Sequence, residues 1–435
     1  MHDLSSLPRR VAGADTEVAV VGQGYVGLTV ASSAAVAGMR VHAIDVLAER
    51  VEALARGEDA VPGVLPSLLE EAFATGLMTF GTDFTAVAGA DVVLLCVPTP
   101  LIDHRPDLSY IEKACQQVAP HLSPGTLVVL ESTTYAGTTE QVVRPLLESG
   151  GLTCGADFAL AYSPERVDPG NTRFGFRQTP RIVGSADPLA ADAAAAFYGR
   201  LVDEVHVLSS ARAAELAKLL ENTFRMVNIA LVNELAVLCA EQGISIWEVI
   251  DAAATKPFGF MPFYPGPGVG GHCIPLDPTY LSWQAYRDTG RRLHLVETAQ
   301  DVNDQMPAYV AARIVDVLNE HGLTLRDAKM LALGVTYKPD VGDVRESAAL
   351  HVLSRLAQRR ARITFHDPFI ERICLGGAEV ERDEFSEELV ESADVVILLT
   401  PHSSYDLAML VDRSRLLFDA RNATGSIQRD HVIRL

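Results

Sequence analysis

The residue most able to do covalent chemistry is Cys273, which stands in the glycine-rich segment 265–277, Pro-Gly-Pro-Gly-Val-Gly-Gly-His-Cys-Ile-Pro-Leu-Asp. Glycines around a thiol let a substrate approach it closely, and a carboxylate, Asp277, follows four residues later. Because thiolates attack carbonyl carbons, this pattern favours a nucleophilic cysteine over an inert core thiol. Asp277 precedes Pro278, so it has a second interpretation as the residue that begins a helix.

A long helix must position two further polar residues. Residues 211–242 contain no glycine and no proline, and apolar side chains recur every three or four positions, which predicts an α-helix. Lys218 and Asn222 stand four residues apart and so lie one above the other on one face of this helix. Taken alone, such a pair is usually two solvated surface residues. The apolar positions are Leu216, Leu220, Phe224, Val227, Leu231, Leu235 and Leu238.

A dinucleotide-binding pattern opens the chain. The apolar run 17–22 leads into Gly22-Gln-Gly-Tyr-Val-Gly27, a helical pattern follows, and a second apolar run ends at Asp45. The glycines allow a tight turn, close approach of the backbone to a pyrophosphate, and close helix packing. Asp45 is placed to accept a hydrogen bond from a ribose 2′-hydroxyl and would repel a 2′-phosphate. The pattern therefore predicts NAD as the cofactor, in preference to NADP.

The same order of elements recurs near the end of the chain, where the runs 329–334, 362–367 and 393–401 repeat 18–22, 40–45 and 90–98. We therefore expect an α/β fold in which two Rossmann-like, doubly wound parallel-sheet domains are joined by a central helical domain with a long spine helix. The expected limits are 1–208 for the NAD domain, 209–322 for the central domain with Cys273, and 323–435 for the C-terminal domain. The second Rossmann-like domain lacks the full glycine pattern, so we expect its ligand not to be another NAD.

Composition narrows the class of partner. The chain has 435 residues, 48% of them hydrophobic, and a formal net charge of −20, which argues against nucleic acid or an anionic membrane as partner. The six cysteines are scattered without a CxxC pair, which is typical of a reduced cytoplasmic protein, and no clustered Cys/His spacing predicts a metal site. No apolar run approaches the roughly 18 to 20 residues of a membrane span without interruption.

Short motifs along nearly the whole chain match, in order, those of one enzyme family. They lie at 22–27, 97–100, 131–134, 163–167, 215–222 and 270–273 with Asp277, at Lys338 with 342–347, and at 418–421. With these motifs the sequence resembles the nucleotide-sugar 6-dehydrogenases, the UDP-glucose/GDP-mannose dehydrogenase family. That family includes UDP-glucose, UDP-N-acetylglucosamine, UDP-N-acetylmannosamine and GDP-mannose dehydrogenases.

The resemblance implies a reaction in which the primary alcohol at C6 of the sugar is oxidised twice to a carboxylate, with NAD consumed in both steps. Cys273 would attack the intermediate aldehyde to give a thiohemiacetal, and loss of the second hydride would leave a thioester that water hydrolyses. Lys218 and Asn222 would stabilise the oxyanion that develops at C6, and Asp277 would handle protons.

Two more residues acquire catalytic roles from the resemblance. Glu165 matches the carboxylate that assists thioester hydrolysis, and Thr133 matches an alcohol that orders the water. Glu165 also has a simpler interpretation as a turn acid paired with Arg166. His272, beside the nucleophile, marks a subgroup and is not expected to act as a base.

The resemblance also assigns binding residues. Those expected to bind NAD are Gly22, Gly24, Tyr25, Val26, Gly27, Asp45, Pro98, Thr99 and Thr133. Those expected to bind the nucleotide sugar are Glu165, Arg166, Lys218, Asn222, Phe263, Tyr264, Gly270, Lys338, Arg345 and Arg421. The family further implies a homodimer formed through the long central helix, with catalysis in the cleft between the two Rossmann domains.

The identity of the sugar stays open at this point. Segment 256–268 resembles the UDP-N-acetylhexosamine subgroup, in which Gly-Gly-His-Cys-Ile-Pro replaces the Gly-Gly-Ser-Cys form common in UDP-glucose enzymes. UDP-glucose enzymes often carry an upstream arginine that reaches a neighbouring subunit's substrate; Pro257 lies near that place, and Lys256 is a candidate replacement. UDP-glucose, UDP-N-acetylglucosamine, UDP-N-acetylmannosamine and dTDP-glucose remain candidates, since one methyl on the base is worth only about 1–3 kcal/mol.

Two other classes of function are compatible with parts of the pattern. A hydroxyacid-type or 6-phosphogluconate-type dehydrogenase also joins a Rossmann domain to a long helix with a lysine and an asparagine, but it performs one oxidation and needs no Cys273. A non-catalytic sensor of NAD or nucleotide sugar would bind the same ligands without turnover. Every expected catalytic position is filled, which disfavours the sensor.

Overall fold

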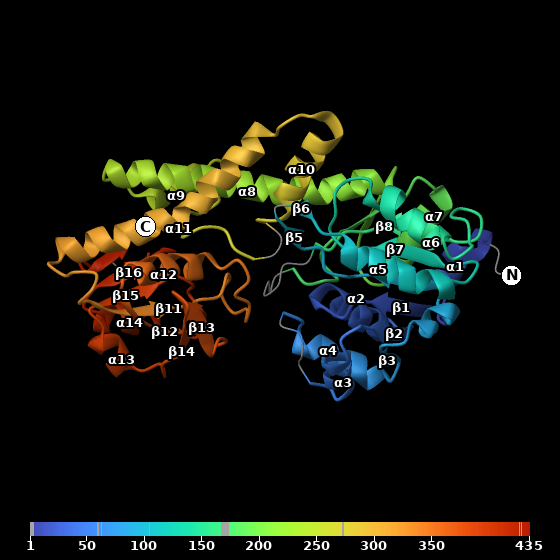
Figure 1. Ribbon diagram of the computed structural model, residues 1–435, viewed down its shortest axis with the longest axis horizontal. Helices are drawn as coiled ribbons and strands as arrows, with labels where there is room; N and C mark the ends of the chain where they lie inside the picture. The colour runs from blue at the N-terminus through green and yellow to red at the C-terminus, as the bar shows by residue number, and fades with distance from the viewer. Residues whose placement is uncertain are drawn as a thin grey trace. The chain divides into compact units, whose positions relative to one another are not determined.

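The computed structural model describes residues 4–58, 61, 63–103, 105–166, 174–271, 274–425, 427 and 429–435. The chain forms two compact units (Figure 1). The first contains Met1–Glu221 and Thr279–Gly290, and the second contains Asn222–Pro278 and Arg291–Leu435. Each unit is built around one main parallel sheet.

The first unit holds an eight-stranded sheet in the order β10-β9-β8-β7-β4-β1-β2-β3. Neighbouring strands are parallel except β8 and β9, which run antiparallel. Strand β1 lies between β2 and β4, so the strand order changes direction at β1, as in a dinucleotide-binding fold. The strands are β1 (Glu17–Val21), β2 (Arg40–Ile44), β3 (Met78–Gly81), β4 (Val92–Leu95), β7 (Leu127–Leu130), β8 (Ala159–Tyr162), β9 (Arg181–Gly184) and β10 (Val205–Leu208).

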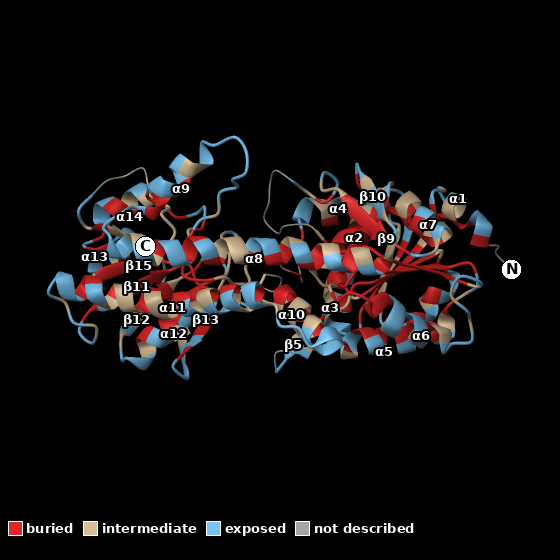
Figure 2. Cartoon of the chain, turned by 90° about the horizontal axis from the view of Figure 1, so that it is seen from above, coloured by how far each residue is buried: buried red, intermediate tan, exposed pale blue. Residues whose placement is uncertain are grey.

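Helices cover this sheet and make its central strands apolar on both faces. Strands β4, β7 and β8 are buried at every residue; buried residues are red in Figure 2. The helices are α1 (Leu7–Val11), α2 (Tyr25–Val36), α3 (Ala48–Ala55), α4 (Pro66–Thr75), α5 (Ser109–Val118), α6 (Arg144–Glu148) and α7 (Pro188–Tyr198). Short pieces complete the unit: the 3₁₀ turns Leu4–Ser6, Phe84–Gly89 and Ala119–His121, the π-helical turn Thr139–Val143, and the hairpin β5 (Leu101–Ile102) with β6 (Arg105–Pro106).

The long helix α8 (Ala211–Glu241) matches the predicted span of 211–242 closely. By length and composition it could cross a membrane, but a single helix of this kind is a weak indication because core helices of soluble proteins pass the same test. Here it carries the polar residues Glu215, Lys218 and Asn222, all buried, which a lipid environment would penalise.

The second unit holds a five-stranded parallel sheet in the order β12-β11-β15-β16-β17. Its strands are β11 (Lys329–Leu333), β12 (Arg362–His366), β15 (Val395–Leu398), β16 (Leu417–Asp419) and β17 (Val432–Arg434), with a separate hairpin of β13 (Arg372–Leu375) and β14 (Ala378–Glu381). The other helices of this unit are α9 (Ile246–Ala254), α11 (His294–Glu320), α12 (Ala348–Gln358), α13 (Glu387–Ser392) and α14 (Leu407–Arg413), while α10 (Asp277–Thr289) begins in this unit and belongs to the first unit from Thr279 on. Helices α11 and α12 contribute Val310, Ile314 and Val352 to the core around β11.

The predicted fold class is confirmed: two Rossmann-like sheets and a long central helix are present. The repeated strand pattern corresponds to β1, β2 and β4 in the first sheet and to β11, β12 and β15 in the second. The compact units divide within α8, between Glu221 and Asn222, and the expected limits of three domains stay a prediction.

Candidate active site

The glycine turn after β1 is shaped for a dinucleotide. Gly22 has φ +94°, and a Cβ at this position would overlap the carbonyl oxygen of Cys96. A Cβ at Gly27, in the first turn of α2, would overlap the carbonyl oxygen of Gly22. At Gly24, by contrast, a Cβ would meet nothing within 4 Å. Two of the glycines are therefore required by packing, while the third leaves open space at the N-terminus of α2, where a pyrophosphate fits.

Asp45 follows β2 and stabilises this turn through hydrogen bonds to the backbone. Its carboxylate accepts hydrogen bonds from the backbone N–H groups of Gln23 (2.7 Å) and Leu47 (2.9 Å). The Arg50 guanidinium, which sequence reasoning did not single out, adds an ion pair at 3.1 Å. Asp45 thus has a structural task besides the expected contact with a ribose, and the preference for NAD over NADP stays a prediction.

The segments that follow β4 and β7 lie side by side at the carboxyl edge of the sheet. Ser132 Oγ accepts from the backbone N–H of Val97 (3.0 Å) and donates to its carbonyl oxygen (2.7 Å). Tyr280 in α10 donates from its hydroxyl to the carbonyl oxygen of Thr99 (2.5 Å). These bonds fix the segments that carry Pro98, Thr99 and Thr133, at the edge where ligands of open α/β sheets bind.

Glu165 and Arg166 follow β8 but do not pair through their side chains. Glu165 accepts from the backbone N–H of Arg166 (2.7 Å) and from Arg181 Nη1 (3.1 Å). The Arg166 guanidinium instead binds Glu221 on α8 (2.7 Å) and the carbonyl oxygen of Pro180 (2.7 Å). Glu165 is therefore paired with Arg166 through the backbone, as in the interpretation of a turn acid, while its side-chain ion pair is with Arg181.

Lys218 lies on α8 in the first unit and is only 8% exposed. Among the residues that the structure describes, its ammonium has no ion pair with a carboxylate. A buried cation without a fixed counter-charge is suited to a site where negative charge develops.

Asn222 and Asp277 meet in the second unit. Both side chains are buried, at 4% and 3% exposure, and Asn222 Nδ2 donates to Asp277 Oδ2. Asp277 is the first residue of α10, which agrees with the interpretation that it begins a helix, while its catalytic role stays a prediction. His272 and Cys273 lie outside the described residues, so the structure does not place the proposed nucleophile.

The glycine segment that leads towards Cys273 packs against the loop after β11. A Cβ at Gly270 would lie 2.7 Å from the carbonyl oxygen of Glu346, and one at Gly271 would lie 2.8 Å from the Tyr337 ring. The backbone N–H of Gly271 donates to the carbonyl oxygen of Arg345 (3.2 Å). Glycine is thus required at both positions because another segment of the same unit occupies the space of a side chain.

Arg421 lies against the same glycine segment. A Cβ at Gly266 would overlap its guanidinium, and Arg421 Nε makes a long hydrogen bond of 3.4 Å to the carbonyl oxygen of Leu399. Burial lowers the pKa of Arg421 to about 10, against a smaller opposing effect of Asp419. A half-buried arginine of this kind is suited to bind a phosphate or carboxylate of a ligand.

The remaining predicted substrate residues have distinct surroundings. Arg345 is exposed and pairs with Asp343 (2.6 Å), and Lys338 belongs to the loop after β11. Phe263 packs edge-on against Phe224, with ring centroids 5.7 Å apart. Tyr264 stacks on Trp247 at 5.9 Å and donates to Asp251 (3.1 Å).

The structure thus groups the predicted site residues within two sets. The first unit holds the NAD residues together with Thr133, Glu165, Arg166 and Lys218. In the second unit, Arg345 and Arg421 contact the glycine segment 265–271, which contains Gly270. The same unit also holds Asn222, Phe263, Tyr264, Asp277 and Lys338. Their assembly into one catalytic centre stays a prediction.

Three family models match the chain in the order of its folds. They are the NAD binding domain (residues 16–202), the central domain (212–305) and the UDP binding domain (331–426) of the UDP-glucose/GDP-mannose dehydrogenase family. The chain belongs to the UDP-glucose/GDP-mannose dehydrogenase family. Its first sheet is therefore an NAD-binding domain and its second a UDP-binding domain, and the chain is an NAD-dependent nucleotide-sugar dehydrogenase.

Relatives in this family are similar over almost their whole length. The UDP-N-acetyl-D-mannosamine dehydrogenase of Pyrococcus horikoshii is 33% identical over 411 residues, which cover 93% of this chain and 95% of that protein. The enzyme of the same name from Escherichia coli is 35% identical over 402 residues, covering 89% and 94%.

Solved structures of the family share the fold. The structure of the Pyrococcus horikoshii UDP-D-ManNAc dehydrogenase matches with a TM-score of 0.85 at 31% identity, covering 96% of this chain and 99% of that one. A UDP-glucose dehydrogenase from Pyrobaculum islandicum matches with a TM-score of 0.84 at 28% identity, covering 97% of each chain. Fold similarity alone therefore does not separate these two substrates.

The structural roles of two buried polar side chains, Glu215 and Gln284, were not predicted from the sequence. Glu215 on α8 accepts from the backbone N–H of Gly137 and from both N–H and hydroxyl of Thr139 (2.8 and 2.6 Å). Gln284 on α10 pairs with both backbone groups of Ala136, accepting at 3.0 Å and donating at 2.5 Å. These side chains hold the loop after Thr133 in place. Glu215 opens the motif 215–222 and Gln284 is a polar residue in a helical pattern, and neither signal names a partner.

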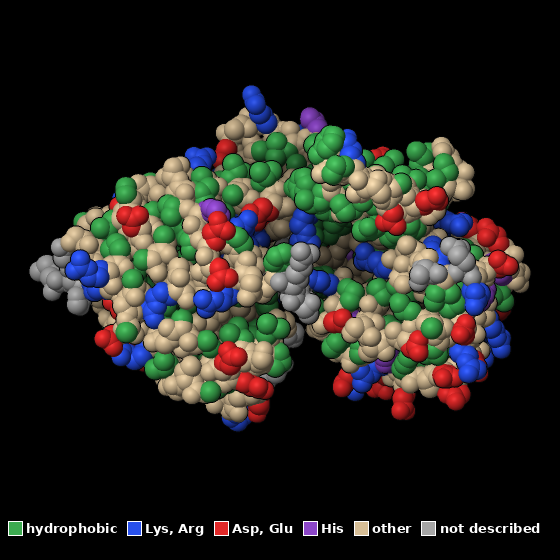
Figure 3. Space-filling model, turned by 180° about the vertical axis from the view of Figure 1, so that it is seen from behind, with side chains coloured by type: hydrophobic (Ala, Val, Ile, Leu, Met, Phe, Trp, Pro, Cys, Tyr) green, Lys and Arg blue, Asp and Glu red, His purple; other side chains and the backbone are tan. Residues whose placement is uncertain are grey.

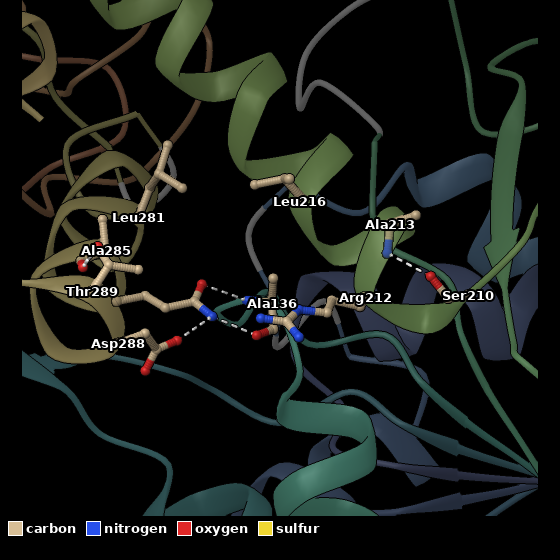
Figure 4. Close-up of a pocket in the computed structure, with 10 residues that line it drawn as sticks. Ala136, Ser210, Arg212, Ala213, Leu216, Leu281, Ala285, Asp288 and Thr289 are labelled. Carbon is tan, nitrogen blue, oxygen red and sulfur yellow. Dashed lines mark hydrogen bonds between the residues drawn. The ribbon is translucent and has the colours of Figure 1, made fainter. Parts of the chain in front are cut away.

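A pocket of about 450 Å³ lies on the outer side of this loop in the first unit (Figure 4). Gln284, Arg212 and Asp288 are the longer polar side chains at its wall, and Leu216 and Leu281 supply apolar contact. It contains none of the predicted catalytic or NAD-binding residues. We assign it no part in the reaction.

Proposed function

We propose that the protein oxidises the C6 hydroxymethyl group of a UDP-N-acetylhexosamine to a carboxylate in two successive NAD-dependent steps, through a covalent intermediate on Cys273. The observation that carries this proposal is the packing of segment 265–271 against the loop that bears Tyr337, Lys338 and Arg345. The segment that leads to the nucleophile lies, in one compact unit, against the UDP-binding fold of the family.

The residues of the glycine turn would hold NAD, which supplies the hydride acceptor for each oxidation. The turn with Gly22, Gly24 and Gly27 would admit its pyrophosphate at the N-terminus of α2, and Asp45 would accept a hydrogen bond from the ribose. The loops with Pro98, Thr99 and Thr133 complete this side of the site.

The chain's own side chains would carry the sugar chemistry. Cys273 would add to the first-formed aldehyde, which keeps this reactive species bound, and the second oxidation would leave an acyl group on sulfur. Lys218 and Asn222 would stabilise negative charge on the C6 oxygen. Asp277, which already accepts from Asn222, would orient that amide and exchange protons with the reacting alcohol.

Hydrolysis of the thioester would complete the cycle. Glu165 would accept a proton from the attacking water and Thr133 would order that water, while Cys273 leaves as the thiolate. Lys338, Arg345 and Arg421 would bind the nucleotide, and Phe263, Tyr264 and Gly270 would shape the sugar pocket.

The choice of an N-acetylhexosamine is supported by two independent similarities. Segment 256–268 resembles that subgroup, and curated relatives with 33% and 35% identity are named UDP-N-acetyl-D-mannosamine dehydrogenases. A structural match of nearly equal TM-score is a UDP-glucose dehydrogenase, so glucose is the second candidate sugar. The base is expected to be uracil, since the matching domain model is that of UDP binding.

The decisive experiment measures NADH formed per nucleotide sugar consumed. UDP-N-acetylglucosamine, UDP-N-acetylmannosamine, UDP-glucose and dTDP-glucose are each supplied as the limiting reagent in excess NAD. Two NADH per sugar, with a uronic acid as product, is the expected result for one N-acetylhexosamine. One NADH per sugar would contradict the role given to Cys273.

The variant C273S separates this proposal from the hydroxyacid-type alternative. We expect it to stop overall turnover, because a serine hydroxyl at this position lacks the nucleophilicity and leaving ability of a thiolate. A single-oxidation dehydrogenase would lose little activity. Turnover of any of the four sugars by the wild type excludes the sensor, and H272A, a change beside the nucleophile with no assigned chemistry, is the matched control.

We also propose a cytoplasmic homodimer that associates through α8. Of the seven apolar positions predicted on α8, all but the half-buried Val227 are exposed in the single chain, among them Leu220 at 64%. Green side chains gather along the upper part of the molecule in Figure 3, where α8 runs in Figure 1. A second copy would remove this surface from water.

A further inference from the structure

Arg181 is a buried arginine that no part of the proposed mechanism uses. It is the first residue of β9, and its side chain is almost wholly enclosed, with the residue 2% exposed. All three guanidinium nitrogens donate: Nε to Ser163 Oγ (3.1 Å), Nη1 to Glu165 Oε2 (3.1 Å), and Nη2 to Glu131 Oε2. Every nitrogen therefore has an acceptor, and two of the acceptors are carboxylates.

Two aromatic rings enclose the guanidinium. Its central carbon lies 4.8 Å from the ring centroid of Tyr198 and 5.3 Å from that of Phe176. The Tyr198 hydroxyl donates to Glu131 Oε1 (2.5 Å), so this second carboxylate is held at both oxygens. The side chain of Arg181 consequently has one available position.

Opposite charges hold Arg181, Glu131 and Glu165 together. Burial alone would lower the pKa of the Arg181 guanidinium, but Glu131 and Glu165 outweigh that effect and raise it. Desolvation raises the pKa of Glu131, and Arg181 opposes this shift. Arg181 therefore stays protonated throughout and acts as a fixed cation, never as a proton donor to a substrate.

The position of Arg181 follows from the topology of the sheet. Strand β9 runs antiparallel to β8 with its last residue, Gly184, beside Tyr162 at the carboxyl end of β8, so the start of β9 lies beside the segment that follows β8. Glu131 follows β7 and Glu165 follows β8, so one guanidinium joins the segments after two neighbouring strands. The segment after β7 also carries Thr133, two residues beyond Glu131.

We propose that Arg181 is a positioning residue for thioester hydrolysis, holding Glu165 Oε2 so that the carboxylate presents one fixed orientation to the attacking water. This inference rests on the proposed function. In the step concerned, water forms a C–O bond to the acyl carbon, the C–S bond to Cys273 breaks, and Glu165 takes one proton from the water. Sulfur leaves as the thiolate, the sugar leaves as an acid that ionises, and no electrons are transferred.

The geometry distinguishes this step from the two oxidations. In the part of the chain that the structure describes, Arg181 donates to Glu165, Glu131 and Ser163 and not to Lys218, Thr99 or the glycine turn. Loss of its hold on Glu165 should therefore slow hydrolysis while leaving formation of the acyl enzyme intact. A misplacement of about 1 Å lowers a catalysed rate about a hundredfold.

The test compares R181K with the wild type in a rapid-mixing experiment on the intact enzyme. Lysine keeps the charge but cannot reach Ser163, Glu165 and Glu131 at once. We expect a burst of two NADH per active site at the wild-type rate, followed by turnover slowed at least tenfold, and an acyl adduct on Cys273 in intact-protein mass spectra. E165Q should behave alike, and the double variant should be no slower than E165Q alone.

Matched controls keep the outcome interpretable. R177K changes a neighbouring arginine that is 70% exposed and pairs with Asp203, and it should match the wild type. S163A removes one acceptor of Arg181 without burying a charge. If R181K does not fold, S163A should show the same slowing of hydrolysis after the burst, to a smaller degree. A burst and a steady rate that fall by the same factor in R181K and S163A, without an adduct, would overturn the inference.

The failure of the proposed function has a different signature. One NADH per sugar from the wild type, with turnover retained in C273S, would remove the thioester and this inference with it. Two NADH per sugar from the wild type, combined with uniformly weakened variants, would reject the role of Arg181 alone.

Discussion

At the scale of single residues, the glycine turn shows that one motif combines separate requirements. Gly22 and Gly27 are constrained by the protein's own backbone, because a Cβ at either position would overlap a carbonyl oxygen. Gly24 is constrained by nothing within 4 Å, and its φ of −77° and ψ of −170° suit any residue. The space beside Gly24, at the N-terminus of α2, is where we expect the pyrophosphate of NAD.

This difference predicts opposite results for two alanine variants. G24A should keep the thermal unfolding midpoint of the wild type and weaken NAD binding at least about tenfold, because the methyl group enters the pyrophosphate space. G27A should unfold at lower temperature, with a loss of about 3 kcal/mol, because the methyl group overlaps the backbone of Gly22. Calorimetry for unfolding and titration with NAD measure both quantities. A G24A protein that binds NAD normally would place the pyrophosphate elsewhere.

The sequence indicated candidate site residues but not the partners that hold them. The motif with Glu165 was recognisable, but its pairing with Arg181 was not, since 16 positions separate them and only the antiparallel start of β9 brings them together. Arg166, adjacent in sequence, points instead to Glu221 on α8. Neighbours in sequence differ in direction, and a sheet edge joins distant segments, so long-range ion pairs need the fold.

At the scale of elements, the two Rossmann-like sheets share one set of hydrogen bonds around an aspartate. Asp367, after β12, accepts from the backbone N–H groups of Val335 (2.7 Å) and Phe369 (3.0 Å). These contacts reproduce those of Asp45 in the first sheet, at the same positions relative to the glycine and the aspartate. In the second sheet a buried histidine, His402, takes the place of Arg50 and contacts Asp367 Oδ2 at 3.0 Å.

Asp367 makes stability depend on pH in a defined direction. Desolvation would raise the pKa of its carboxyl, but the hydrogen bonds from His402, Val335 and Phe369 outweigh it and hold the pKa below the ordinary 3.8. The ionised carboxylate therefore stabilises the fold above pH 3.8, and this contribution disappears as the pH falls through the lowered value.

D367N should accordingly lower the free energy of unfolding by about 1–3 kcal/mol at pH 7, since an amide turns a donor towards another donor. The difference in free energy of unfolding between D367N and the wild type should become smaller as the pH falls below 3.8, because the wild-type carboxyl then becomes protonated. Urea unfolding at a series of pH values measures both curves. D412N, at an exposed acid of α14, should show no gap, and a gap for D367N that is independent of pH would contradict the account.

The apolar periodicity of the chain was sufficient to predict the strands that repeat, and the absence of glycine and proline predicted the length of α8. It did not predict that β9 and β10 extend the first sheet beyond an antiparallel step at β8, nor the π-helical turn Thr139–Val143 that Glu215 caps. These features depend on tertiary hydrogen bonds and not on local pattern.

At the scale of the whole molecule, α8 carries more exposed apolar surface than a solitary chain would need. The exposed side chains are Leu216, Leu220, Phe224, Leu231, Leu235 and Leu238, spaced by three to seven positions. This spacing places them along one side of the helix, in a largely apolar strip that also holds the exposed Glu234. A two-fold dimer would bury the strip on both copies at once.

The variant L220E tests this arrangement, because a carboxylate at the most exposed leucine of α8 would be buried twice in a two-fold interface. We expect the wild type to have about twice the chain mass of 46.8 kDa in light scattering after size exclusion, and L220E to have the mass of one chain with an unchanged circular dichroism spectrum. L65E, at an exposed leucine that precedes α4, should remain dimeric. A wild type that stays monomeric at micromolar concentration, or an L220E protein that stays dimeric, would mean that another partner or another face covers α8.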